Sequence, residues 1–523
     1  MAACRLMQGG TEWAGEACLT RVSGAPPAGP PSPGRTHMRP LAAEATVFFT
    51  SGAVLVLEIL ALRLLAPYVG VTLETYTATI ATVLAGISVG TWAGGYLADR
   101  MDPMRLLGPL MVLGGGLSLL AVPVVRMVGA GGGSSGVGLS LVGFFAPAAV
   151  LSAVSPTVVK LQLRDLAATG RVVGRLSALG TAGAIAGTFL AGFVLVEAVP
   201  TSTAILAVGG ALVVAGTGLW MWLWRRSLRV ALAILVLGFL GTSLGASVTG
   251  PCDVETVYHC ARIVRDSAHP AGRLLVLDTL RHSYVDLDDP TRLEFAYAKV
   301  VADVVAGVVP AGAVRTLHIG GGGFTLPRYL AAVRPGSTST VLEIDAGLVR
   351  LAQERLGLTT GPDLDVRVGD ARLLLRSVPR RGYDVVIGDA FGGLAVPWHL
   401  TTEEFLTGVR ASLDDGGTYV MNLIDYPPLR FARAEVTTLA RIFDSVAVIA
   451  APEVLDGRRG GNIVLVAGTG PLDTERIAMN IAGRQGAEVV LSGTAVEDFA
   501  GGAATLVDDL APVDQWLSRA RRP

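Results

Sequence analysis

The chain has little charge and few cysteines for its length. Only 16% of its 523 residues are charged, 51% are hydrophobic, and the formal net charge is −1. A near-neutral chain has no overall charge with which to attract nucleic acid or another highly charged partner, so the informative charges are local. So high a hydrophobic fraction is unusual for one soluble domain, and it places part of the chain in a lipid bilayer.

Four cysteines are too few for a disulfide framework. Two of them, Cys4 and Cys18, fall in an N-terminal segment that contains "SGAPPAGPPSPGR" and lacks apolar periodicity. We interpret residues 1–44 as disordered or as an over-extended start. The segment has no apolar core, which excludes a signal peptide.

Long apolar runs alternate with short basic loops across residues 45–249. A bilayer core needs roughly 20 apolar residues per helix. Seven candidate membrane spans meet this requirement, at about 46–66, 76–97, 106–125, 138–158, 177–197, 202–223 and 230–249. The sequence therefore predicts an N-terminal α-helical membrane bundle of about seven spans.

Small residues recur at four-residue spacing inside these spans. Gly86, Gly90 and Gly94 share one span, and Gly183 and Gly187 share another. This spacing either allows close packing between membrane helices or reflects glycine that is simply tolerated there.

Glu58 and Arg63 lie in the first span, where ionisable groups are costly and usually face a partner or a cavity. The alternative is a structural ion pair or an arginine that snorkels to the interface. The loop "GGYLADRMDPMR" after the second span resembles the corresponding loop of major-facilitator transporters, a family with twelve spans.

Basic residues predict the orientation, because they bias a loop to the cytoplasmic side. Three alternate loops carry nine of them, and the other loops carry only Arg126. We expect a cytoplasmic N-terminus, and seven spans then place everything after Gly250 on the outer face. In that oxidising setting Cys252 and Cys260 form either a disulfide or two unpaired thiols. The nine residues are Arg100, Arg105, Lys160, Arg164, Arg171, Arg175, Arg225, Arg226 and Arg229.

The pattern changes after Gly250 to that of an α/β domain. Residues 252–292 read as a small β-hairpin region with a turn at "HPAG", and 293–308 as a helix that opens a Rossmann-like domain reaching residue 523. Apolar strands such as "VRTLHI", "STVLEI", "LDVRV", "YDVVIGD" and "TYVMNLI" then alternate with helices. This alternation predicts a doubly wound parallel sheet that binds ligands at the carboxyl ends of its strands.

Four glycines, Gly320, Gly321, Gly322 and Gly323, follow the first of these strands. They do not spell the dinucleotide fingerprint G-x-G-x-x-G, and neither a lysine nor a Ser/Thr pair follows to hold a triphosphate. A tight turn without a ligand is the alternative.

Two acidic residues at the next strand ends favour a nucleoside ligand. Glu343 lies where a carboxylate can accept hydrogen bonds from ribose hydroxyls, and Asp370 could accept from the exocyclic amine of adenine. An adenosyl sulfonium of the S-adenosylmethionine type fits best, with the glycines admitting its aliphatic tail close to the backbone.

The domain now resembles the spermidine synthase family, the polyamine aminopropyltransferases, and in particular its multi-pass membrane-fused members. The resemblance covers about residues 252–520 and is specific only as a set of motifs. These are "GRLLVLDTLRHSYVDLDD", "GGGGF", "EID", "GDAR", "YDVVIGDAF" followed by "LTTEEF", and "ATLVDDLAPVDQWL".

The resemblance implies transfer of an aminopropyl group from decarboxylated S-adenosylmethionine to a polyamine. Asp389 would be the catalytic carboxylate that accepts the proton of the amine or orients it. Glu343 and Asp370 would hold the nucleoside, and His282 stands where the family usually has glutamine and could touch the thioether side. A capping role for Asp389 and a structural role for His282 are the alternatives. No metal and no permanently bound cofactor are implied.

Departures from the family pattern concern the acceptor. Gly392 and Trp398 replace two carboxylates, the glycine-loop Asp is missing, and "LEFAY" stands where a Tyr-His-Glu type motif is usual. A diammonium substrate needs carboxylates at both ends, because a buried cation without a partner is costly. We expect putrescine to be a poor acceptor, and an acceptor with one amine, or with an apolar body against Trp398, to be better.

Three hypotheses follow: a membrane-anchored transferase with decarboxylated or ordinary S-adenosylmethionine as donor, a binding or sensing module without turnover, and a transporter with an accessory transferase-fold domain. The partners expected are a lipid bilayer, a small amine and, optionally, a second copy of the chain.

Overall fold

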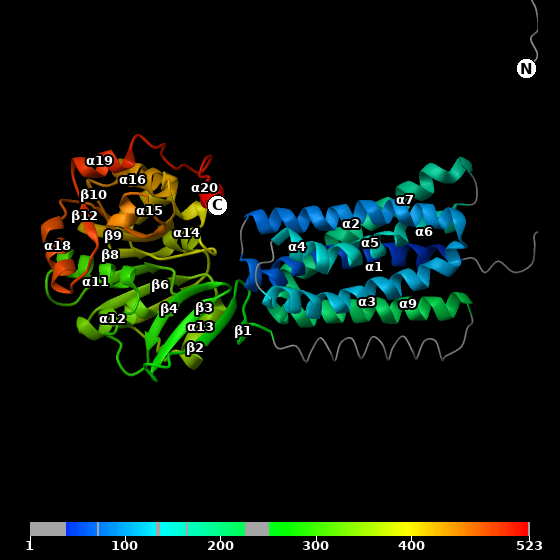
Figure 1. The fold of residues 1–523 in the computed structure, drawn as a ribbon, viewed down its shortest axis with the longest axis horizontal. Coiled ribbons are helices and arrows are strands. Elements are labelled where there is room, and N and C mark those ends of the chain that lie inside the picture. Colours follow the sequence, from blue (N-terminus) through cyan, green and yellow to red (C-terminus); the bar gives the residue numbers. More distant parts are fainter. Residues whose placement is uncertain (1–37, 71–72, 132–135, 164–165, 225–249, 521–523) are drawn as a thin grey trace, which may run out of the picture. The chain divides into compact units, whose positions relative to one another are not determined.

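The computed structural model describes residues 38–520 except 71–72, 132–135, 164–165 and 225–249 (Figure 1). Long helices occupy the described residues up to Trp224, and strands and helices alternate from Gly250 onward. The protein therefore combines an apolar helical region with an α/β domain, as the hydrophobic pattern predicts.

Within the residues that the structure describes, six stretches of helix are long and apolar enough to cross a membrane. Each overlaps one of the first six predicted spans, and the predicted span at 230–249 lies outside the described residues. Two of these stretches each contain a short π-helical segment, η1 (Leu141–Phe145) in one and η3 (Ala191–Leu195) in the other. The α-helices are α1 (Pro40–Val69), α2 (Leu73–Arg100), α3 (Pro103–Ala130), α4 (Gly136–Ser140), α5 (Ala146–Ser152), α6 (Val154–Gln162), α7 (Thr169–Leu190), α8 (Val196–Ala198) and α9 (Thr201–Trp224).

The spaced glycines of α2 and α7 lie where two helix backbones meet. A Cβ atom on Gly86 would come within 2.8 Å of the carbonyl oxygen of Phe145, and one on Gly94 within 2.6 Å of the Cα of Ala153. A Cβ on Gly187 of α7 would overlap the main chain of α1. Small residues at these positions thus permit close helix packing, which decides between the two interpretations of the spacing.

A four-stranded antiparallel sheet of order β1-β2-β3-β4 opens the α/β domain. It corresponds to the β-hairpin region expected from the sequence, and the predicted "HPAG" turn joins β2 to β3. Its strands are β1 (Val254–Glu255), β2 (Cys260–Arg265), β3 (Gly272–Leu277) and β4 (Leu280–Asp286).

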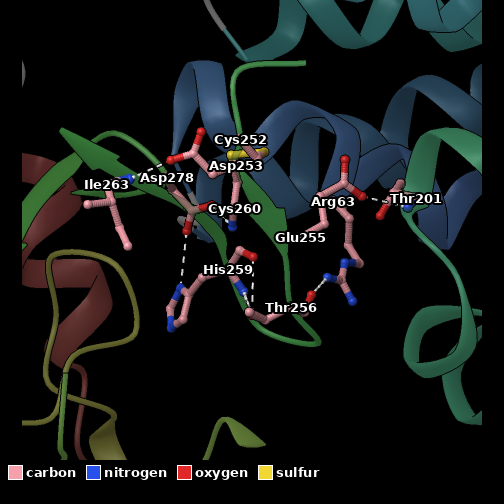
Figure 2. The surroundings of a disulfide bond; sticks show 10 residues. All are labelled: Arg63, Thr201, Cys252, Asp253, Glu255, Thr256, His259, Cys260, Ile263 and Asp278. Carbon is pink, nitrogen blue, oxygen red and sulfur yellow. Dashed lines mark hydrogen bonds and ion pairs between the residues drawn. A yellow bond between two sulfur atoms is a disulfide. The ribbon is translucent and has the colours of Figure 1, made fainter. Parts of the chain in front are cut away.

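The disulfide Cys252–Cys260 links the start of this sheet to β2 (Figure 2). Beside it, Arg63 of α1 donates a hydrogen bond to the main-chain carbonyl of Thr256. Arg63 is therefore held by the chain that precedes β2, and it does not form an ion pair with Glu58.

The second sheet has eight strands in the order β12-β10-β11-β9-β8-β5-β6-β7. The five strands β7, β6, β5, β8 and β9 are parallel, as predicted. Strands β11 and β12 run in the opposite direction, and β10 lies between them and runs in the same direction as β9. The five strands named from the sequence are thus parallel, but the sheet as a whole is mixed. The chain crosses over from β9 to β10, which runs in the same direction, and reverses only after β10, where it enters β11. The strands are β5 (Arg315–Ile319), β6 (Thr338–Glu343), β7 (Leu364–Val368), β8 (Tyr383–Gly388), β9 (Leu413–Asp425), β10 (Ser445–Ala450), β11 (Gly461–Gly468) and β12 (Val489–Leu491).

Helices cover both faces of the eight-stranded sheet (Figure 1). Successive residues of β8 enter opposite cores: Val385 and Ile387 pack with α11, α12 and α18, and Val386 packs with α15, α16, α19 and α20. This alternation follows from the two-residue period of a strand. The helices that position the site or cover the sheet are α11 (Ala296–Val308), α12 (Thr325–Val333), α13 (Ala346–Arg355), α14 (Ala371–Leu374), α15 (Glu403–Ser412), α16 (Arg430–Ile442), α18 (Thr474–Gly483), α19 (Thr494–Ala500) and α20 (Val513–Ala520).

Candidate active site

The predicted site residues follow four neighbouring parallel strands. Gly320–Gly323 follows β5, Glu343 is the last residue of β6, Asp370 follows β7, and Asp389 directly follows β8. Parallel strands end at the same edge of a sheet, so the order β7-β6-β5-β8 brings these groups together there.

The glycine loop passes very close to other parts of the chain. Gly320 has φ of 94°, and a Cβ on it would lie 2.6 Å from the carbonyl oxygen of Asp389. Gly322 has φ of 52°, and a Cβ there would lie 2.8 Å from the Oγ of Ser283. Both positions require glycine for conformation and for space. The loop thus packs against β4 and the end of β8, and Gly320 and Gly322 also line a cavity.

Glu343 organises this loop from the end of β6. Its Oε2 accepts hydrogen bonds from the backbone N–H groups of Gly321 at 2.7 Å and Gly322 at 3.3 Å, and its Oε1 accepts from the N–H of Asp345 at 2.9 Å. The side chain is only 6% exposed, and burial raises the pKa of its carboxyl group. Glu343 therefore holds the glycine loop in place, which the sequence pattern did not indicate.

Asp370 has two partners of its own. Its Oδ1 accepts from the N–H of Leu373 at 3.1 Å and caps α14, while its Oδ2 lies 3.0 Å from the Nε2 of His399. His399 lines the same cavity, although sequence reasoning did not single it out. Only the tertiary fold brings this histidine, 29 residues away in the chain, to the carboxylate.

Asp389 is held by groups from two other elements. The hydroxyl of Tyr297 donates to its Oδ2 at 3.0 Å, and the Nδ2 of Asn422 donates to its Oδ1 at 2.8 Å. Asn462 donates in turn to the Oδ1 of Asn422 at 3.0 Å. Burial raises the pKa of Asp389 to about 6, against these two hydrogen bonds, which lower it. A carboxylate with such a pKa can both accept and release a proton near neutral pH.

Two cavities meet at Asp389. The first cavity is lined by Gly320, Gly322, Glu343, Asp370 and His399 among others, and the second by Arg281, Phe295, Asn422 and Asn462 among others. His282, Asp389 and Phe391 line both of them. A single carboxylate, that of Asp389, therefore stands between the two cavities.

His282 lies at this shared boundary, with its ring edge-on to Phe391 at 6.2 Å between centroids. Burial lowers its pKa to about 4, so the imidazole is neutral near pH 7. A second histidine, His259, lines the first cavity next to Cys260, and its Nδ1 lies 3.3 Å from the Oδ2 of Asp278 (Figure 2). The disulfide and Asp278 thus fix the segment just before β2, where His259 lies.

Gly392 and Trp398 are not among the residues that line the second cavity. Trp398 is 43% exposed and falls outside the lining of both cavities, and Gly392 forms an isolated bridge with Ala395. Among the residues that line the second cavity, Asp389 is the only carboxylate.

Sequence comparison finds relatives among the polyamine aminopropyltransferases, although no family model matches the chain. Polyamine aminopropyltransferase 2 of Streptomyces coelicolor is 26% identical over 455 residues, which cover 80% of this chain and 81% of that protein. This coverage exceeds what the α/β domain alone provides, so the match includes apolar helices. The polyamine aminopropyltransferase of Vibrio vulnificus is 34% identical over 110 residues, which cover 21% of this chain and only 37% of that enzyme.

A crystal structure of a probable spermidine synthase from Corynebacterium glutamicum is 32% identical in sequence. The match covers 51% of this chain and 99% of that one, with a TM-score of 0.47.

Proposed function

Because its α/β domain is spermidine synthase-like, we propose that this chain is a membrane-anchored transferase that moves an aminopropyl-type group from an adenosyl sulfonium donor to a small amine. The sequence relatives named aminopropyltransferases support the reaction class. The six long apolar helices support the membrane anchor.

One observation carries the proposal: Asp389 stands in the wall common to two cavities. In a transfer between two bound molecules, the reacting atoms must meet beside the group that takes the proton. Holding both molecules in that geometry removes much of the entropic barrier to a bimolecular reaction.

The donor belongs in the first cavity. Glu343 and Asp370 would accept hydrogen bonds from the nucleoside, while Gly320 and Gly322 would let its aliphatic tail approach the backbone. His282, neutral at pH 7, would contact the sulfur side without repelling a sulfonium charge.

The acceptor belongs in the second cavity. Its nitrogen lone pair attacks the donor carbon bound to sulfur, so that a C–N bond forms as the S–C bond breaks. The electron pair of the broken bond stays on sulfur and gives a neutral thioether. Asp389 takes the proton that the nitrogen loses, and its raised pKa suits it to this task.

Product formation by the purified full chain in detergent tests the proposal. Mass spectrometry should detect an amine carrying the transferred group when decarboxylated S-adenosylmethionine is the donor. Calorimetry with each donor form is measured in parallel. Donor binding without product from a broad panel of amines would overturn the transferase and favour a binding or sensing module.

We further propose that the α/β domain faces outward, on the strength of the basic loops and of a seventh span at 230–249. Six spans would instead leave the domain on the same side as the N-terminus. A reporter that is active only in the cytoplasm, fused after Pro523, decides between the two orientations. Activity of this reporter would refute the outward assignment. Adenosyl donors are made in the cytoplasm, so an outward enzyme requires an external supply of donor.

A further inference from the structure

The second cavity has an unusual charge for a site that is expected to hold a polyamine. Besides Asp389 it presents one other group that carries a full charge at neutral pH, the guanidinium of Arg281 on β4. His282 is neutral there, because burial lowers its pKa to about 4, and the buried phenol of Tyr297 has a pKa raised well above its ordinary value. With Asp389 ionised, the lining is therefore neutral overall.

A diamine that is charged at both ends would share this cavity with a positive charge, the guanidinium of Arg281. One ammonium group can face Asp389, but the other has no carboxylate among the lining residues and shares the space with Arg281. Like charges brought together outside bulk water repel, and an unpaired ammonium that leaves water is strongly penalised. The cavity thus offers a carboxylate to only one end of the acceptor that the relatives' names suggest.

Arg281 is available to a ligand. It is exposed, its guanidinium carbon lies 5.6 Å from the ring centroid of Phe295, and none of the carboxylates in the described part of the chain forms an ion pair with it. Arginine is the side chain best suited to hold a carboxylate, since its planar fork can donate two parallel hydrogen bonds.

The rest of the cavity suits a short molecule with a small apolar body. Its volume is about 240 Å³, below the range of drug-sized ligand pockets. Leu280, Phe391 and Ile424 supply apolar wall, and the amides of Asn422 and Asn462 supply neutral polar wall.

We infer that the acceptor is a short zwitterion of the amino acid class, with its amine at Asp389 and its carboxylate at Arg281. This inference rests on the proposed transferase function and specifies the substrate of the same site. The transferred group forms its bond to the amine nitrogen, and the carboxylate of the acceptor takes no part in the chemistry.

Matched acceptors test the inference with the full chain in detergent and decarboxylated S-adenosylmethionine as donor. Amino acids with a terminal amine and three to five carbons are compared with the diamines of equal length, and 1-aminobutane serves as a monoamine without a second charge. We expect kcat/KM for the best amino acid to exceed that for its matched diamine by about tenfold or more, the ratio that one charge-assisted hydrogen bond provides.

Substitution at Arg281 separates recognition from catalysis. Arg281→Gln should lower the ratio of kcat/KM for the amino acid to kcat/KM for 1-aminobutane about tenfold, and Arg281→Glu should reverse the preference towards the diamine. Arg265→Gln, at an exposed arginine of β2 outside both cavities, is the matched control and should change neither value.

Each other result has a definite meaning. Faster turnover of the diamine by the wild-type chain overturns the zwitterion and leaves the transferase function standing. Weaker binding of ordinary S-adenosylmethionine to Arg281→Gln, measured by calorimetry, assigns Arg281 to the donor and also overturns the inference. Donor binding without product from any acceptor overturns the inference and the proposed function together.

Discussion

The helical region and the α/β domain both bury polar side chains, but they satisfy them in different ways. In the helices, the buried hydroxyls of Thr50, Ser118 and Thr157 each donate to the main-chain carbonyl four residues earlier. In the α/β domain, Glu343 accepts from loop N–H groups 21 and 22 residues away, and Asp389 accepts from side chains 33 and 92 residues away.

The difference shows where chemistry can be placed. A hydroxyl that bonds to its own helix carries no net charge and needs only local structure, which suits an apolar environment. A buried carboxylate with a raised pKa needs donors at fixed positions, and only a folded domain holds distant donors there. Changes in the two regions should therefore have separable effects.

The largest expected effect comes from Asp389→Asn. The amide keeps the shape of the side chain and loses the proton acceptor, so transfer should fall by about 10²- to 10⁴-fold while donor binding stays nearly intact. Turnover and calorimetric titration measure the two quantities. Asp415→Asn, at a highly exposed aspartate, is the control and should retain full activity. Equal activity in Asp389→Asn and the wild type would remove Asp389 from the reaction.

Gly94→Ala should lower the stability of the helical region and leave the site unchanged. The added methyl would lie 2.6 Å from the main chain of Ala153, whereas Gly95, the next residue, has open space. Overpacking of this kind costs about 1–3 kcal/mol. Thermal unfolding of the full chain in detergent should show a lower midpoint for Gly94→Ala than for Gly95→Ala, with unchanged donor affinity at low temperature. Equal midpoints would contradict the close packing of α2.

Glu343→Gln and Asp370→Asn should affect the site and leave the helical region unchanged. Each loses a charge-assisted acceptor, which should weaken donor binding by about 1.5–3 kcal/mol. Because Glu343 also holds the glycine loop, its substitution should lower the stability of the α/β domain as well, and Asp370→Asn should lower it less. Calorimetry and thermal unfolding give both values, and wild-type donor affinity in both variants would argue against the nucleoside assignment.

The smallest expected effect is a shift in pH dependence. The reactive form of Asp389 is the carboxylate, so activity should be present above a pH of about 6 and be lost as the pH falls through that value. The hydrogen bond from Tyr297 lowers this pKa, so Tyr297→Phe should move the acid limb of kcat/KM to higher pH. Tyr329→Phe on α12, outside both cavities, is the control. An acid limb that does not move in Tyr297→Phe would mean that another group sets it.

The sequence by itself determined the features that depend on local physics. Apolar runs of membrane length predicted seven spans, and the described residues contain a long apolar helix at each of the first six, because hydrophobic length is a local property. The alternation of strands and helices predicted the parallel half of the sheet, and Gly320, Glu343, Asp370 and Asp389 were placed together because parallel strands share one carboxyl edge.

Tertiary structure alone decided how these groups are held and used. The partners of Asp389 come from α11 and β9, and no sequence spacing announces a hydrogen bond across 92 or 33 residues. The reversal of the chain after β10 made the sheet mixed, since strand direction depends on how the chain returns and not on the composition of a strand. The position of Arg281 in the lining of the second cavity is likewise decided by packing. The sequence places Arg281 on a strand but does not show which other elements face it.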